Sequence, residues 1–109
     1  MFARILEFTP KAEKRDDLIK TIRQEVLPIM KKQPGFLELL PFVPDAAKEK
    51  MVGISLWTER NAAERYVDEM FPQVERILKP FLVGRVMVRM YKVETTVCQH
   101  FVEALTSAA

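Results

Sequence analysis

The spacing of apolar residues changes several times along the chain, and each change marks an expected helix or strand. Residues 2–8 form a short aliphatic and aromatic run typical of a strand, and Thr9-Pro10 suits the N-cap and first position of a following helix. Six apolar residues then recur at three- and four-residue steps, which is the stripe of an amphipathic helix. They are Leu18, Ile19, Ile22, Val26, Ile29 and Met30. Pro28 interrupts this stripe, so we expect the helix to kink or end near Leu27, with a looser turn up to Gln33.

The second part of the chain predicts three more strands and a second, broken helix. Strands are expected at 36–43, 50–57 and 84–94, and Pro41 favours a sheet edge for the first of them. Thr58 suits the N-cap of a helix that breaks at Phe71-Pro72 and continues for a turn or two to Phe81. The order β-α-β-β-α-β predicts a ferredoxin-like α+β fold, an antiparallel sheet with both helices on one face.

The strands do not alternate cleanly between apolar and polar residues, as a sheet with one wet face should. In the third strand we expect the helix side to carry Val52, Ile54 and Leu56. The open side would then carry Met51, Gly53, Ser55 and Trp57. In the fourth strand one face has Val86, Val88 and Met90, and the other has Arg85, Met87, Arg89 and Tyr91. An apolar patch of that size is rarely left in water, so we expect a second copy of the chain to cover it in a twofold homodimer.

Composition excludes several classes of protein without pointing to one function. With 109 residues, the chain is expected to form one domain at 2–94, followed by a tail at 95–109 that either forms a short helix or frays. Seventeen basic residues are interleaved with fifteen acidic ones, which argues against a nucleic-acid or membrane partner. The absence of a signal-peptide pattern and the single Cys98 favour the cytoplasm.

Two segments carry a likeness to a known family. The helix end "PIMKKQPGFLEL" and the strand end "SLWTERNAAERY", followed by a Pro-broken helix and a last strand, resemble the antibiotic biosynthesis monooxygenase (ABM) family over about residues 2–93. The resemblance implies ferredoxin-like domains that pair through their sheets into a dimeric α+β barrel. It also implies cofactor-free monooxygenation of a small aromatic, quinol or polyphenol-like substrate, although other members degrade haem and many have no assigned activity. Fold alone does not choose among these.

Five residues are candidates for binding a substrate: Arg4, Ser55, Trp57, Tyr66 and Arg89. The resemblance implies that Trp57 lines a cavity between sheet and helices, whereas a tryptophan closing a central strand is also a normal core residue. Arg4 and Arg89 lie mid-strand, and we expect both to project into one open-face cavity. There they would bind a phenolate or carboxylate, or be paired by Glu38 or by the other subunit. Ser55 and Tyr66 would orient substrate oxygen atoms.

The catalytic role itself has alternatives. The quinone-forming enzymes carry an Asn on the strand before the tryptophan, where this chain has Gly53 and Ser55, and this favours a non-catalytic dimeric module that binds a small molecule or has a structural role. The haem-degrading branch uses a histidine from the second helix region, but the single histidine here is His100 in the tail. We therefore expect no metal and no cofactor, and the catalytic residues are not assigned.

Overall fold

A four-stranded antiparallel sheet forms one layer of the molecule. The computed structural model describes residues 1–46 and 48–107. The strands are β1 (Phe2–Pro10), β2 (Phe36–Phe42), β3 (Met51–Trp57) and β4 (Leu82–Lys92). Their order in the sheet is β2-β3-β1-β4, with every neighbouring pair antiparallel. This confirms the ferredoxin-like α+β prediction, and it places Pro41 on the edge strand β2, as expected.

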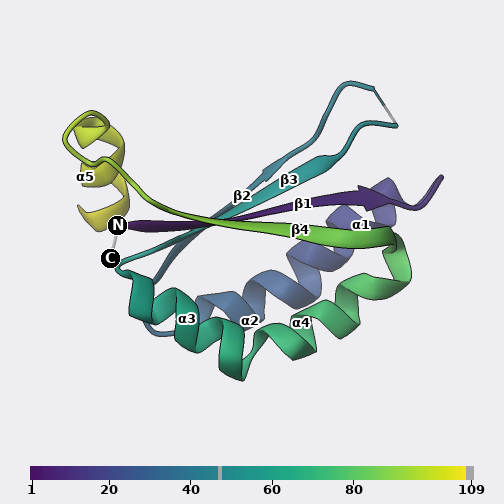
Figure 1. The fold of residues 1–109 in the computed structure, drawn as a ribbon, viewed down its shortest axis with the longest axis horizontal. Coiled ribbons are helices and arrows are strands. Elements are labelled where there is room, and N and C mark those ends of the chain that lie inside the picture. The colour runs from purple at the N-terminus through teal and green to yellow at the C-terminus, as the bar shows by residue number, and fades with distance from the viewer. Residues whose placement is uncertain (47, 108–109) are drawn as a thin grey trace.

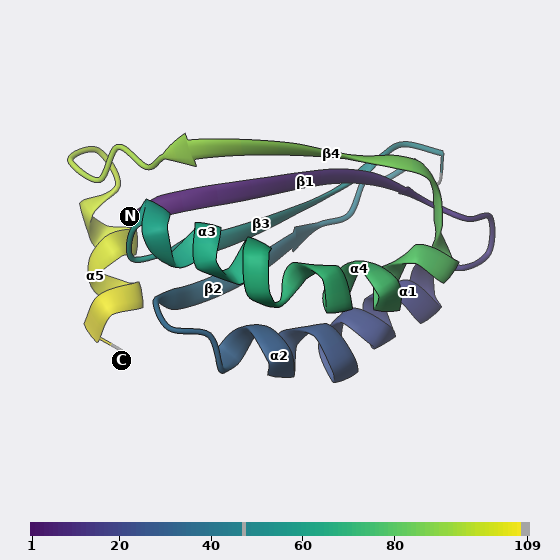
Figure 2. The same ribbon diagram turned by 60° about the horizontal axis from the view of Figure 1, so that its bottom comes forward.

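The helices between the strands all lie on one face of this sheet, as Figures 1 and 2 show. The first group is α1 (Arg15–Thr21), a π-helical turn (Ile22–Val26) and α2 (Leu27–Lys31). The second is α3 (Arg60–Glu69), α4 (Phe71–Leu78) and a 3-10 turn (Lys79–Phe81). The break between α3 and α4 falls at Met70, next to the predicted Phe71-Pro72 break.

Two predicted helix starts were wrong. The backbone of Thr9, Pro10 and Thr58 pairs with residues outside the helices. Thr9 and Pro10 pair with Val83 and Leu82 of β4, so β1 extends through Pro10 and the helix begins at Arg15. The Thr58 N–H donates to the Gly35 carbonyl at 2.8 Å, and the N-cap of α3 is Glu59, one residue later.

Pro28 does not end the first helix, which was one of the two alternatives expected near Leu27, the other being a kink. The helical path continues to Lys31 through the π turn that directly precedes the proline. The Leu27 N–H bonds the Ile22 carbonyl five residues back. A π turn changes the hydrogen-bond register at the point where a proline has no N–H to donate, which explains why the two occur together.

The expected orientation of β3 was also wrong. Met51 and Trp57 are fully buried against the helices, whereas Val52, Ile54 and Leu56 lie on the open face. Both sets are apolar in this strand, so hydrophobicity could not choose between them, and a one-residue shift exchanges the faces. The faces of β4 are as expected from Val86 to Tyr91: Val86 and Met90 pack on the core, while Met87 and Tyr91 are exposed.

The tail forms a helix, which is one of the two alternatives. This helix, α5 (Gln99–Ser107), contacts β2 and lies at the end of the sheet near the N-terminus, away from α1–α4 (Figure 1). Within residues 1–46 and 48–107, no helix combines the length and apolar character that crossing a membrane requires.

Candidate functional site

Two polar side chains are buried on the helix-covered face of the sheet. Arg4 in β1 is 3% exposed and Ser55 in β3 is 4% exposed, and the two residues are paired across the strands. A buried polar group costs free energy unless it finds partners. The partners of these two side chains therefore decide whether the pair is structural or available to a ligand.

The Ser55 hydroxyl is already engaged by its neighbours. It accepts a hydrogen bond from Trp57 Nε1 at 2.9 Å and donates one to the Arg4 carbonyl at 3.4 Å. Trp57 is thereby fixed through its single polar atom. Ser55 positions the tryptophan, and its proton is not free for a substrate.

Arg4, by contrast, has an unused donor. Its Nε is buried and has no hydrogen-bond partner among the described residues. The guanidinium lies over aromatic rings, with Cζ 4.1 Å from the Phe71 centroid and 5.8 Å from that of Tyr66. Burial lowers the pKa of the Arg4 guanidinium, while Tyr66 and Glu75 partly oppose that shift. Arg4 is thus a desolvated cation without a direct anionic partner.

A row of aromatic rings surrounds this cation. Trp57 and Tyr66 stack at 5.0 Å between centroids, and Phe36 and Phe71 extend the row at either end. Burial raises the pKa of the Tyr66 hydroxyl to about 12, against a smaller opposing effect of Arg4. Tyr66 therefore keeps its proton at neutral pH and serves as a donor or wall, not as a base.

The Pro34-Gly35-Phe36 turn holds one end of this row. Gly35 adopts a φ of +81°, and a Cβ there would lie 2.5 Å from that of Ala62 in α3. Only glycine accommodates both the conformation and the contact. The turn and the start of α3, the two segments that carry the family likeness, therefore pack against each other and support Trp57.

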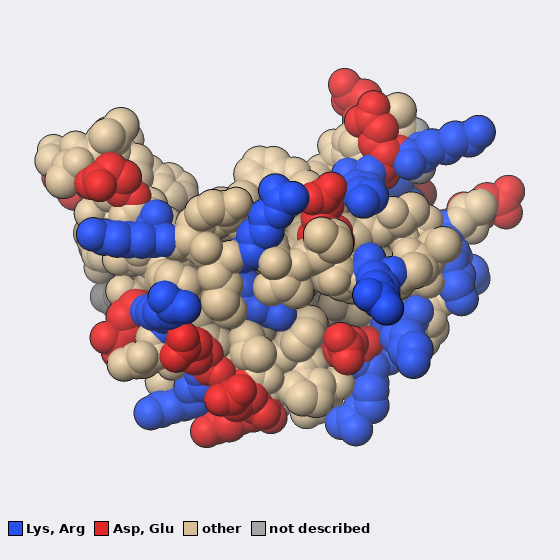
Figure 3. Space-filling view, viewed as in Figure 1, with Lys and Arg blue, Asp and Glu red and all other residues tan. Residues whose placement is uncertain are grey.

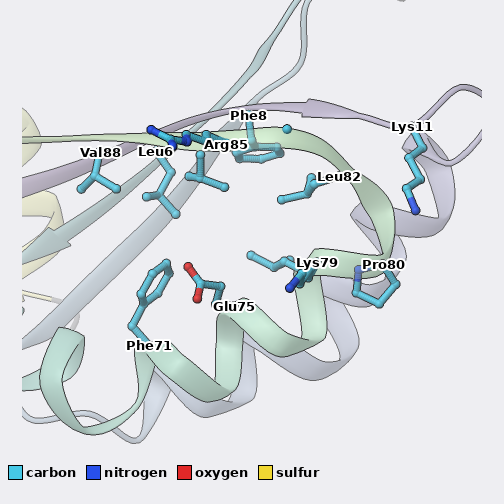
Figure 4. Close-up of a pocket in the computed structure, with 13 residues that line it drawn as sticks. Leu6, Phe8, Lys11, Phe71, Glu75, Lys79, Pro80, Leu82, Arg85 and Val88 are labelled. Carbon is cyan, nitrogen blue, oxygen red and sulfur yellow. The ribbon is translucent and has the colours of Figure 1, made fainter.

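Two neighbouring spaces lie between the sheet and the helices. A small cavity of about 50 Å³ is lined by Arg4, Ser55 and Tyr66 together with apolar side chains. A larger groove of about 730 Å³ runs between the β1–β4 side of the sheet and α4 (Figure 4). Leu6, Phe8 and Leu78 line both. Trp57 lies behind the small cavity, with its indole against Ser55 and Tyr66.

The groove brings in charged residues that were not among the candidates: Lys11, Glu75, Lys79 and Arg85. Phe71, Glu75 and Lys79 recur at four-residue steps, so one face of α4 and the turn after it supplies three of the lining residues. Arg85 was expected on the open face. Arg85 lies in the irregular stretch of the β1–β4 pairing, between the Glu7–Met87 and Thr9–Val83 pairs, and borders the groove. Figure 4 shows its guanidinium at the level of the strands.

The expectation that Arg4 and Arg89 share one cavity was wrong. Arg4 pairs with Met90, so Arg89 points to the opposite face and is exposed. Glu38 also lies on the open face, opposite Leu56, and its carboxylate accepts the Leu39 N–H at 2.9 Å. It is therefore not the partner of Arg4. Four of the five predicted residues, Arg4, Ser55, Trp57 and Tyr66, do come together.

The described residues contain no group of three or more His, Cys, Asp or Glu side chains placed to hold a metal ion. His100 lies in α5, away from the cavity between the sheet and the helices, and is exposed.

Comparison with known proteins relates this chain to a family. The structure superposes on SnoaB, a cofactor-independent oxygenase from Streptomyces nogalater, with a TM-score of 0.72, 15% identity and coverage of 85% of this chain and 92% of that one. A monooxygenase from the gene ActVA-Orf6 of Streptomyces coelicolor, in complex with nanaomycin D, matches with a TM-score of 0.71 and 16% identity, over 85% of this chain and 87% of that one. A conserved protein from Methanosarcina mazei Go1 matches with a TM-score of 0.71 and 12% identity, over 86% of this chain and 94% of that one.

At these identities the structural matches show a shared fold, and no curated protein matches the sequence. The family model for antibiotic biosynthesis monooxygenases matches residues 1–70, which is more than half of the 109 residues. The chain therefore belongs to the antibiotic biosynthesis monooxygenase family.

Proposed function

We propose that this chain is a cofactor-independent monooxygenase that oxidises a small aromatic, quinol or polyphenol-like substrate. The observation that carries the proposal is Arg4, a buried cation whose Nε has no partner and which lines the cavity next to an open groove. Family membership and the fold shared with SnoaB, named a cofactor-independent oxygenase, support the same class of reaction.

The two spaces fit the two reactants. The groove, at about 730 Å³, is in the range of small-molecule sites, about 300–1,000 Å³. The cavity beside Arg4, at about 50 Å³, exceeds the roughly 30 Å³ that one water occupies in the liquid, so it has room for a diatomic gas. The substrate would lie in the groove with its phenolic oxygen toward Arg4.

In the proposed reaction, a phenol and dioxygen give a quinone and water. One oxygen atom replaces a ring C–H opposite the hydroxyl, the other leaves as water, and the two hydrogens of that water come from the ring carbon and the hydroxyl. The ring supplies the electrons, so no other reductant is needed. Arg4 would stabilise the phenolate that donates these electrons. The attraction between a preorganised cation and its ligand in a site without water grows as negative charge develops on the ligand.

Oxygen uptake with a panel of phenols that carry a hydrogen opposite the hydroxyl, measured in the presence of a chelator, tests this proposal. We expect uptake above the autoxidation blank and a drop in kcat/KM of about 100-fold in Arg4→Met, the size expected for the loss of one stabilising group. Arg89→Met, on the open face, is the matched control. Uptake that is equal in wild type and Arg4→Met would refute the role of Arg4.

The second candidate function is a dimeric module that binds a small molecule without turning it over. The engaged Ser55 hydroxyl and the protonated Tyr66 favour it, because neither serves as a base. Ligand binding in the groove without oxygen uptake across the panel would support this alternative. A haem titration tests the third alternative, a haem-degrading enzyme. A shift of the Soret band on addition of the protein would support that alternative.

We also propose that a second copy of the chain covers the open face of the sheet. Met87, Tyr91 and Phe42 are 48%, 49% and 52% exposed there, and an apolar row of Leu40, Ile54 and Ile5 crosses the face, with Glu7 between Val52 and Met87. Ile54 lies at its centre, paired with Ile5 and Leu40. Light scattering should give a dimer for wild type and a monomer for Ile54→Asp. A wild-type monomer at micromolar concentration would refute the dimer.

A further inference from the structure

A second groove approaches the small cavity from the other edge of the sheet. This β2-side groove, of about 200 Å³, lies between β2 and the helical path from α1 to α2, and its lining residues are Ile19, Ile22, Arg23, Leu27, Leu39 and Pro41. The larger groove lies between the β1–β4 side of the sheet and α4. Figure 2 shows the strands in order from β4 at the top down to β2, next to α2. The two grooves therefore flank the small cavity on opposite sides.

The β2-side groove and the small cavity share part of their lining. Ile22, Leu39 and Pro41 line both spaces, and Ile22 and Leu39 are half-buried. Leu39 and Pro41 pair across the strands with Ser55 and Gly53, which also line the cavity. Partly exposed side chains change rotamer within roughly picoseconds to nanoseconds, so this aliphatic boundary can open for a small molecule without movement of the backbone.

The two grooves differ in charge. The larger groove is lined by Lys11, Glu75, Lys79 and Arg85, and Figure 3 shows Lys and Arg gathered near the end of α4. Of the described residues that line the β2-side groove, only Arg23 is charged, and it is exposed to water. Burying a polar or charged group without partners costs free energy. The β2-side groove therefore suits a small apolar molecule better than a phenol or a phenolate.

The position of the substrate in the proposed reaction leaves the β2 side of the cavity free. Leu6, Phe8 and Leu78 line both the larger groove and the small cavity, so a phenol in that groove would cover this approach. Dioxygen has no charge and donates no hydrogen bond, and apolar cavities in proteins accept gases such as xenon. From the β2 side, dioxygen would reach the cavity beside Arg4 while the phenol is already in place.

We infer that dioxygen enters the small cavity from the β2-side groove, past Ile22 and Leu39, while the substrate occupies the larger groove. This inference rests on the proposed function, because it assigns the entry of the second reactant to the same site. It gives each reactant a groove of its own, so neither has to leave before the other can enter.

The single tryptophan provides a way to detect dioxygen in the cavity. Trp57 is fully buried, donates to the Ser55 hydroxyl at 2.9 Å and stacks on Tyr66 at 5.0 Å between ring centroids. Ser55 and Tyr66 line the cavity, so a molecule there is separated from the indole by no more than one side chain. Dioxygen quenches indole fluorescence on collision. The lifetime of Trp57 fluorescence therefore measures entry of the gas without any turnover of substrate.

The test measures this lifetime as the dioxygen pressure is raised, with no substrate present. Leu39→Phe enlarges a side chain at the boundary and should lower the quenching rate constant about fivefold, equivalent to about 1 kcal/mol in the barrier to entry. Leu39→Ala should raise the rate constant. Ile19→Phe narrows the β2-side groove at a residue that does not line the small cavity, and it should also lower the rate constant. Val88→Phe makes the matched change in the larger groove and should leave quenching as in wild type.

Acrylamide, a larger and polar quencher, is the check on folding, because it reaches Trp57 only when the fold loosens. Each variant should exclude acrylamide as wild type does. Dioxygen quenching that is equal in wild type, Leu39→Phe and Ile19→Phe would overturn the inference, as would a larger fall in Val88→Phe.

These results are distinct from failure of the proposed function. Oxygen uptake with phenols, together with unchanged quenching in Leu39→Phe and Ile19→Phe, would refute the entry route and leave the monooxygenase standing. A fall in quenching in both variants without uptake on any phenol would establish the route for the gas and refute the monooxygenase.

Discussion

The two faces of the sheet carry similar residues in opposite environments. Arg4 and Arg89 lie on neighbouring strands one register position apart, yet Arg4 is buried under Phe71 and Arg89 is exposed. The tyrosines on the two sides of the sheet differ in the same way: Tyr66, on α3, is 2% exposed, and Tyr91, on the open face, is 49% exposed.

The difference shows which polar residues need a functional explanation. A charge on the open face has water as a partner, so its presence costs little. Arg4 has lost water and gained no acceptor for Nε, so packing alone does not account for it. The open face has the reverse character, since large apolar side chains such as Met87 and Tyr91 are exposed there.

The largest difference in stability between variants on the two faces is expected for Trp57→Ala. This fully buried side chain contacts Phe36, Tyr66 and Ser55, and its truncation should lower the free energy of unfolding by about 4 kcal/mol. Met87→Ala, on the open face, should cost less than about 1 kcal/mol in the monomer. Denaturant unfolding at several protein concentrations measures both.

A cost for Met87→Ala that grows with protein concentration would show that the open face is buried in a dimer. Similar costs for the two variants in a monomer would contradict the assignment of the faces.

Periodicity in the sequence was sufficient for the order of the elements, because helices and strands bury their residues at different spacings. Pro41 and the break at Phe71-Pro72 were also interpreted correctly, since proline restricts its position strongly. Arg4, Ser55, Trp57 and Tyr66 could be proposed together, although the three strand residues, Arg4, Ser55 and Trp57, were expected on the wrong face of the sheet. The reason is that β3 is apolar on both sides, so its orientation depends on pairing with β1 and β2.

The groove could not be predicted from the same patterns. Phe71, Glu75 and Lys79 were visible at four-residue steps, but which face of that helix meets the sheet follows only from packing. Arg85 lies where the β1–β4 register shifts near Gly84, and this shift sets two residues of β1 against four of β4. Irregular pairing of this kind leaves little trace in the pattern of apolar residues.

A smaller difference in stability is expected at alkaline pH between variants of Tyr66 and Tyr91. The pKa of Tyr66 is about 12 in the folded state, against about 10 when unfolded, so the folded state holds the proton more tightly. Its contribution to stability is fully present below pH 10 and is lost as pH rises to about 12, by about 2 to 3 kcal/mol. Urea unfolding between pH 9 and 12 measures this loss.

Tyr66→Phe should lose less stability than wild type over that range, because it has no hydroxyl to ionise in a buried site. Tyr91→Phe is the control and should follow wild type. The same pH dependence in all three proteins would place the loss on other groups.

The smallest effect on stability is expected for the two arginines, and it is the one that separates structure from function. Arg4→Met keeps a long side chain beside Phe71 while removing a desolvated charge and an unpaired Nε, so stability should rise by about 1 kcal/mol or stay unchanged. Arg89→Met should be neutral in a monomer. Chemical denaturation resolves both changes.

If Arg4 were a structural residue, Arg4→Met would destabilise the fold and leave ligand binding intact. If Arg4 is held for a substrate anion, the variant should be as stable as wild type or more so, with oxygen uptake and the affinity for phenolates reduced. A buried cation that the fold does not need, in the wall of a cavity that shares lining residues with a groove, is best explained by the charge of a ligand.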